Sequence, residues 1–181
     1  NPPIDSLREN RVMSLNTHFG NHGNILDSAE RQPVTVLDSP VLTNREWQFL
    51  RGHFAGQAAE IDCTFDLALG AEGLRQAIAR IRAEAEDAVR SGKSQLFLTD
   101  EAQGPGRVAV TMILAAAGVH THLVRKGLRT FASINVRSAE CLDTHYFAVL
   151  IGAGATTVNA YLAEEAIRDR QTRGLFGERP L

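Results

Sequence analysis

From residue 58 onward, the chain repeats one pattern four times: a short stretch with the residue types of a buried strand, then a longer stretch with helical periodicity. The expected strands and helices, in chain order, are Glu60–Phe65, Leu74–Val89, Gln95–Thr99, Val108–Lys126, Phe131–Val136, Glu140–Ile151, Thr156–Asn159 and Tyr161–Arg173. Strands that alternate with helices of this length are typical of a parallel sheet with right-handed crossovers. The sequence therefore predicts an α/β fold in which four consecutive βα units form a parallel sheet, either open or resembling half of a (β/α)-barrel.

The first 57 residues differ from the rest, because proline, asparagine and glycine recur and only short apolar runs lie between them. We expect a short strand at Val34–Leu37 and a helix near Asn44–Arg51, with Thr43 as N-cap and a glutamate three residues later completing a capping box. Such a segment cannot bury a core of its own. We therefore divide the chain into an irregular N-terminal part, residues 1–57, and a βα core, residues 58–181.

The composition is that of one globular domain: 181 residues, of which 44% are hydrophobic and 22% charged. The formal net charge is -2, and the sequence contains no block of charged residues of one sign, which argues against nucleic-acid binding. No apolar run approaches the roughly 20 residues that span a bilayer, and the first residues do not resemble a signal peptide. Cys63 and Cys141 lie far apart and outside any CxxC pair, so we expect two small buried hydrophobic residues in a reduced, cytoplasmic protein.

Active sites of βα folds form at the carboxyl ends of the strands, which here are the stretches Thr99–Gly106, Arg137–Glu140 and Asn159–Tyr161. In the loop that begins with the first stretch and ends at Arg107, Asp100, Glu101 and the arginine lead into the next expected helix, and these residues could hold a metal or an anion. The alternative is a loop whose acidic residues cap that helix. The second interpretation is favoured, because neither GxGxxG nor GxxxxGK[ST] is present.

The histidines and cysteines do not form a metal-binding pattern. His120 and His122 lie two residues apart on an expected helix, so their side chains point about 200° apart. Cys141 and His145 have the i, i+4 spacing of a zinc pair, but no second pair of ligands accompanies them. We expect these histidines to hydrogen-bond locally or to face a neighbouring domain, and Cys63, in the middle of a strand, to lie in the core.

No nucleophile motif such as GxSxG occurs. The segment Gly152–Ala155 follows a helix and precedes a strand, which is the wrong order for a phosphate-binding loop, so a tight turn is expected. Residue patterns therefore predict no catalytic, cofactor-binding or metal-binding residue in this chain.

Several segments resemble the large subunit of glutamate synthase, of the bacterial NADPH-dependent type, and run in family order from one end of the chain to the other. They are Asn1–Leu15, Phe19–Leu26, Asp38–Leu42, Val119–Thr130 and Asp143–Ile167. The resemblance covers only the central domain of that polypeptide, so a piece of a longer oxidoreductase is expected.

In that family, a glutaminase domain precedes the central domain, and a synthase barrel with FMN and an iron–sulfur cluster follows it. The resemblance implies a parent reaction in which glutamine, 2-oxoglutarate and NADPH yield two glutamates, with ammonia passing between the sites through a protein channel. It places the cofactors outside this chain, with NADPH used through the small subunit, and it implies that the isolated chain is inactive. The segment Asn1–Asp5 corresponds to a region near the channel mouth, so Asn1 is expected to line it; the alternative is a rigid linker stiffened by Pro2 and Pro3.

Two further hypotheses stay open. The chain could be a free-standing small enzyme or ligand-binding protein that uses the loop Asp100–Arg107, which requires a pocket rimmed by Asp100, Glu101 and Arg107. It could also be a protein-interaction module with an exposed apolar face.

Overall fold

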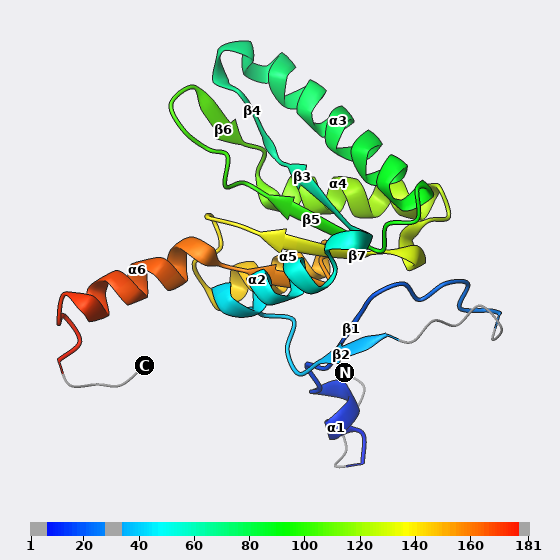
Figure 1. The fold of residues 1–181 in the computed structure, drawn as a ribbon, viewed down its shortest axis with the longest axis horizontal. Helices are drawn as coiled ribbons and strands as arrows, with labels where there is room; N and C mark the ends of the chain where they lie inside the picture. The colour runs from blue at the N-terminus through cyan, green and yellow to red at the C-terminus, as the bar shows by residue number, and fades with distance from the viewer. Residues whose placement is uncertain (1–6, 28–33, 178–181) are drawn as a thin grey trace.

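A computed structural model describes residues 7–27 and 34–177. Its centre is a parallel sheet of four strands: β3 (Ala58–Asp62), β5 (Gln95–Thr99), β7 (Ser133–Arg137) and β8 (Thr157–Asn159). The strands lie side by side in chain order, as in half of a (β/α)-barrel (Figure 1). The predicted α/β class and the four consecutive βα units are therefore confirmed.

Helices cover both faces of the sheet. On one face lie α3 (Gly70–Arg90), α4 (Met112–Arg125) and α5 (Thr144–Gly152), and on the other lies α2 (Asn44–His53) (Figure 1). The last helix, α6 (Tyr161–Thr172), extends away from the sheet and contains no buried residue. No helix in the described part of the chain is long and apolar enough to cross a membrane.

The two faces of the sheet bury different side chains because successive strand residues point to opposite sides. Leu96 and Leu98 join the larger apolar cluster under α3, α4 and α5. Phe97 points the other way and packs edge-on against Trp47 of α2, with ring centroids 4.9 Å apart. Apart from Phe97, the α2 side of β5, β7 and β8 is polar and buried: Gln95, Thr99, Ser133, Asn135, Arg137, Thr157 and Asn159.

The N-terminal part contains α1 (Glu9–Val12) and a two-stranded antiparallel sheet of β1 (Thr17–Phe19) and β2 (Thr35–Leu37). The predicted strand and the predicted helix start are both confirmed. Thr43 caps α2 by accepting the backbone N–H of Glu46, whose carboxylate accepts the backbone N–H of Thr43 at 2.8 Å. The division of the chain at residue 57 stays a prediction.

The segment expected as one strand, Glu60–Phe65, is interrupted at Cys63. Residues Thr64–Asp66 form a separate strand, β4, which pairs antiparallel with β6 (Arg107–Ala109). The prediction of a helix from Val108 is therefore wrong: α4 begins only at Met112. The reason is that residues 107–109 obtain their backbone hydrogen bonds from β4 instead of from a helical turn.

Helix α5 also begins later than its expected start at Glu140. Asp143 is its N-cap, because the carboxylate accepts the backbone N–H of Tyr146 at 2.8 Å. Short 3₁₀ turns complete the chain at Ala55–Gln57, Leu67–Leu69 and Arg129–Phe131.

The tight turn expected at Gly152–Ala155 is present between α5 and β8, and Gly154 adopts a φ of +114° there. Cys63 and Cys141 are both buried and unpaired, as predicted. Burial raises the pKa of the Cys63 thiol to about 12, which suits an inert core residue better than a nucleophile.

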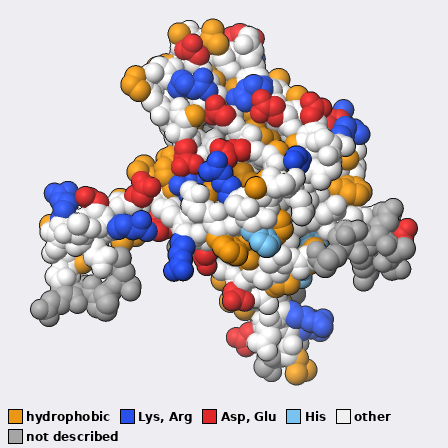
Figure 2. Space-filling view, viewed as in Figure 1, with side chains coloured by type: hydrophobic (Ala, Val, Ile, Leu, Met, Phe, Trp, Pro, Cys, Tyr) orange, Lys and Arg blue, Asp and Glu red, His pale blue; other side chains and the backbone are white. Residues whose placement is uncertain are grey.

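Acidic and basic side chains are interspersed on the face shown in Figure 2, with hydrophobic side chains between them. This face carries no extended area of one sign.

Candidate functional site

Arg137, the last residue of β7, is the centre of a polar cluster at the carboxyl end of the sheet. Its side chain is only 5% exposed, and Nη1 donates to Asn159 Oδ1 at 2.6 Å and to Asn44 Oδ1 at 3.3 Å. Its Nε lies 2.8 Å from Glu101 Oε2, although the N–H does not point at that oxygen, so the contact is an ion pair and not a hydrogen bond. The guanidinium also lies 4.7 Å from the centroid of the Tyr161 ring, within cation–π range.

Asp100 is completely buried beside this cluster. Its two carboxylate oxygens accept the backbone N–H of Ala139 at 2.9 and 3.2 Å, and the Tyr161 hydroxyl donates to it as well. Burial raises the pKa of the Asp100 carboxyl above its usual 3.8, and these hydrogen bonds limit the rise.

A second tyrosine–carboxylate pair lies near Asp100. The Tyr146 hydroxyl donates to Glu140 Oε2, which also accepts the backbone N–H of Met112 at 3.4 Å. Burial, and then the Glu140 carboxylate, raise the pKa of the Tyr146 hydroxyl. The carboxylates of Asp100, Glu101 and Glu140 are thus all engaged by groups of the same domain.

The structure separates Arg107 from Asp100 and Glu101. Arg107 Nη2 donates to Asp62 Oδ2 at 2.7 Å and to Thr64 Oγ1 at 2.6 Å, and so it ties β6 to the end of β3. The loop also leads into a strand, so it does not form the anion site at a helix N-terminus that the sequence allowed. The three side chains required by the small-enzyme hypothesis do not converge.

His120 and His122 make local hydrogen bonds, as expected. His122 Nε2 lies 2.6 Å from Glu86 Oε2, and His120 Nδ1 accepts from Arg129 Nε at 3.0 Å. Cys141 is buried while His145 is exposed, so this pair does not share a site. Among the described residues, no group of three histidine, cysteine, aspartate or glutamate side chains could hold a metal ion.

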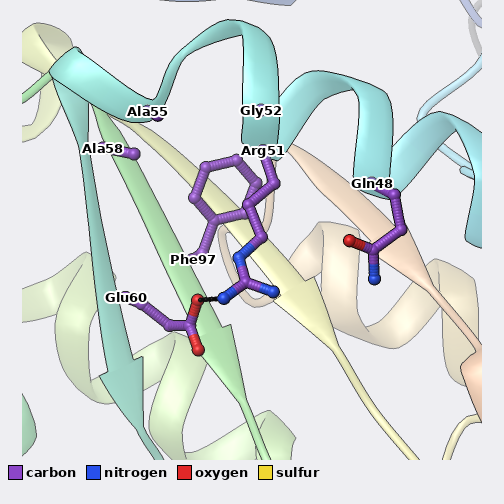
Figure 3. A pocket seen from close by; sticks show the side chains of 7 residues that line it. All are labelled: Gln48, Arg51, Gly52, Ala55, Ala58, Glu60 and Phe97. Carbon is purple, nitrogen blue, oxygen red and sulfur yellow. Dashed lines mark ion pairs between the residues drawn. The ribbon is translucent and has the colours of Figure 1, made fainter.

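A cavity of about 400 Å³ lies between α2 and the edge strand β3. Figure 3 shows the Arg51 side chain reaching from α2 towards Glu60 of β3, with the Phe97 ring beside it. Arg51 Nη2 and Glu60 Oε2 are 2.6 Å apart, and both side chains are nearly half exposed. This pair joins the two charged side chains that line the cavity.

Comparison with known proteins identifies the family of this βα domain. The sequence model described as the glutamate synthase central domain matches residues 1–179. The chain belongs to this family. The prediction made from the five segments is therefore confirmed.

The chain is 63% identical over 182 residues to the glutamate synthase [NADPH] large chain of Azospirillum brasilense. It is 38% identical to the large chain of the same name from Bacillus subtilis, and 41% identical to the chloroplastic ferredoxin-dependent glutamate synthase of Spinacia oleracea. These alignments cover 100%, 90% and 93% of this chain, but only 12%, 11% and 11% of the respective relatives. This glutamate synthase central domain therefore corresponds to about an eighth or less of the length of its curated relatives.

Sequence patterns identified the ends of the strands as the place to look but missed the residue that organises them. Arg137 and Tyr161 fall in the stretches that we expected to carry chemistry, yet only the fold places the ring beside the guanidinium. In this central domain, the polar side chains at the carboxyl end of the sheet make contacts within the domain. Asn1, the expected channel-lining residue, lies outside the described residues.

Proposed function

We propose that this chain is a non-catalytic central domain that links the glutaminase and FMN synthase domains of a glutamate synthase large chain. We also propose that it contributes to the wall of the conduit that carries ammonia between them. The parent reaction would convert glutamine, 2-oxoglutarate and NADPH into two glutamates in the cytoplasm. NADPH would act through a small subunit.

One observation carries the non-catalytic assignment: internal contacts engage the polar groups at the carboxyl end of the sheet. A βα enzyme needs free acids, bases or anion-binding groups at this edge. Here the side chain of Arg137 is 95% buried between Asn159 and Glu101, and Asp100 is committed to the backbone of Ala139. These side chains therefore already make contacts within the domain before any substrate arrives.

The cofactors of the parent would bind elsewhere in the large chain. An iron–sulfur cluster requires several cysteine thiolates that can approach one another. This chain has two cysteines in its whole sequence, Cys63 and Cys141, and both are buried and unpaired. The residues present do not fit the cluster, so the adjoining domains would supply its ligands.

The linker and conduit roles rest on the family resemblance of the first residues. Asn1 would line the mouth of the conduit, held by the stiff backbone of Pro2 and Pro3. A bulky side chain at this position should obstruct ammonia transfer without touching either reaction centre.

A substitution in the full-length large chain tests the conduit. We expect Asn1→Trp to preserve glutamine hydrolysis but to release free ammonia, so that fewer glutamates form per glutamine consumed. Asn10→Trp, on an exposed position of α1, is the matched control and should leave this ratio unchanged. An unchanged ratio in Asn1→Trp would remove Asn1 from the conduit wall. Glutamine turnover by the purified 181-residue chain would refute the non-catalytic assignment.

A further inference from the structure

A second cavity, of about 290 Å³, lies at the opposite, amino-terminal edge of the sheet. The start of β5 forms part of its lining, and the segment around β1 crosses over it. Gly20 anchors that segment, because its backbone N–H donates to Ser133 Oγ at 2.9 Å. The lining side chains that matter below are Phe19, Asn21, Phe54, Gln57, Ser94 and Gln95.

Gln95, in the wall of this cavity, has an unpaired hydrogen-bond donor with almost no accessible surface. The residue is completely buried, and its Oε1 accepts from Asn135 Nδ2 at 3.0 Å. Asn135 in turn accepts from Thr157 Oγ1 at 2.8 Å, which fixes the orientation of this polar row. Gln95 Nε2 is left without a hydrogen-bond partner among the described residues. A buried donor without an acceptor is costly, so an acceptor from outside the protein is expected at this atom.

Two more carboxamide side chains of the lining also use their oxygen to accept a hydrogen bond within the protein. Asn21 Oδ1 accepts the backbone N–H of Gly23 at 2.7 Å, so the amide nitrogen of Asn21 is the end left for a ligand. Gln57 Oε1 accepts from Ser94 Oγ at 3.0 Å, with the same result. Neither amide nitrogen donates to another described residue. The oxygens of three amides are therefore occupied by the protein, while their nitrogens have no hydrogen-bond partner among the described residues.

The residue types of this lining indicate which class of ligand fits the cavity. It contains no aspartate or glutamate, so it offers no negative charge to an ammonium ion, which can only donate. A carboxylate can only accept, and its two oxygens can take several N–H donors at once. Phe19 and Phe54, with ring centroids 5.1 Å apart, add an apolar wall for a short carbon chain. The volume lies near the lower limit for small-molecule sites.

We propose that the cavity lined by Asn21, Gln57 and Gln95 binds the carboxylate group of a small organic acid. This proposal does not depend on the proposed function. It lies at the edge of the sheet opposite to the Arg137 cluster, so a ligand there would act on the position of the N-terminal segment and not on the chemistry of the parent.

The test compares two probes of the same shape, succinate and succinamide, by titration calorimetry on the full-length polypeptide. Succinamide replaces acceptor oxygens with N–H₂ groups, which would meet further donors in the cavity. We expect succinate to bind at least about tenfold more tightly than succinamide, a difference of about 1.4 kcal/mol.

Two variants locate the binding. Asn21→Asp and Gln57→Glu each keep the oxygen that the protein already uses, and each replaces the remaining N–H donor with a repelling oxygen. Both should weaken succinate binding by at least about tenfold, while Gln171→Glu, an equal charge change on exposed α6, should leave it unchanged. Equal binding by wild type and both cavity variants would overturn the proposal. So would a succinate-soaked crystal structure with water alone at Gln95 Nε2.

Discussion

The Arg137 guanidinium lies 4.7 Å from the centroid of the Tyr161 ring, and this contact joins the end of β7 to the first residue of α6. The Tyr161 hydroxyl continues the link by donating to Asp100, at the end of β5. Because α6 contains no buried residue, this stack and its hydrogen bond are an important attachment of the helix to the sheet. The polar cluster therefore has a structural function.

Replacement of Arg137 tests that function. Arg137→Met removes the ion pair to Glu101 and the bond to Asn159, and we expect it to lower the free energy of unfolding by about 2–3 kcal/mol. This loss of stability is smaller than the loss expected on breaking a fully buried ion pair. The Glu101 side chain is 41% exposed, so water solvates part of the charge that Arg137 no longer neutralises. Arg137→Lys keeps the charge but loses the planar fork, so about half of this loss is expected.

Urea unfolding followed by far-ultraviolet circular dichroism measures both variants. Arg173→Met is the control, because its ion pair to Asp169 is exposed and should contribute less than about 0.5 kcal/mol. Equal stability of Arg137→Met and Arg173→Met would show that the cluster contributes little.

Asp100 gives a prediction for the pH dependence of stability. Its pKa is raised in the folded protein, chiefly by burial, so the folded state holds the proton more tightly than the unfolded state. This contribution to stability is complete below the ordinary pKa of 3.8 and is lost as the pH rises through the folded pKa. Asp100→Asn keeps an oxygen for the Ala139 N–H and cannot ionise. The variant should therefore lose less stability than wild type when the pH rises from about 4 to 7, as measured by urea unfolding at each pH. Parallel curves for the two proteins would contradict the raised pKa.

The sequence was sufficient to predict the sheet because its strands are short buried runs bounded by turn residues. Gln95–Thr99 was located from its apolar centre alone, and the capping box at Thr43 was located from local spacing. The start of α4 could not be located in this way. Residues 107–109 pair with a strand more than 40 residues earlier, and no local signal reports such a pairing.

The same limit applies to the two sites. Sequence patterns mark charged residues at strand ends, and so they led to Asp100 and Glu101. They do not mark neutral carboxamides that are far apart in sequence, such as Asn21, Gln57 and Gln95. Only the fold brings these three side chains to one cavity and shows which ends of their amides are occupied.

Glu86 gives a second pH prediction with the opposite sign. Hydrogen bonds from Arg90, first, and from His122 lower the pKa of this carboxyl from 4.5 to about 2. A lowered folded pKa contributes stability that is present above pH 4.5 and is lost as the pH falls towards 2. Glu86→Gln should remove this part of the acid-induced loss, so its stability should change less than that of wild type between these pH values. Acid titration followed by circular dichroism measures the difference, and Glu165→Gln on exposed α6 is the control.

Gly154 makes a prediction that depends on backbone geometry and packing together. Its φ of +114° is one that other residues rarely adopt, and an added Cβ would collide with the ring of His120. His120 cannot move aside freely, because Arg129 donates to its Nδ1 and also to the Gly154 carbonyl at 2.8 Å. Gly154→Ala should therefore lower the free energy of unfolding by about 3 kcal/mol or more. Gly56→Ala is the matched control, since Gly56 has no positive φ and a Cβ there would meet no atom within 4 Å. Chemical denaturation should separate the two variants clearly, and a loss below about 1 kcal/mol in Gly154→Ala would mean that the turn can relax around the new methyl group.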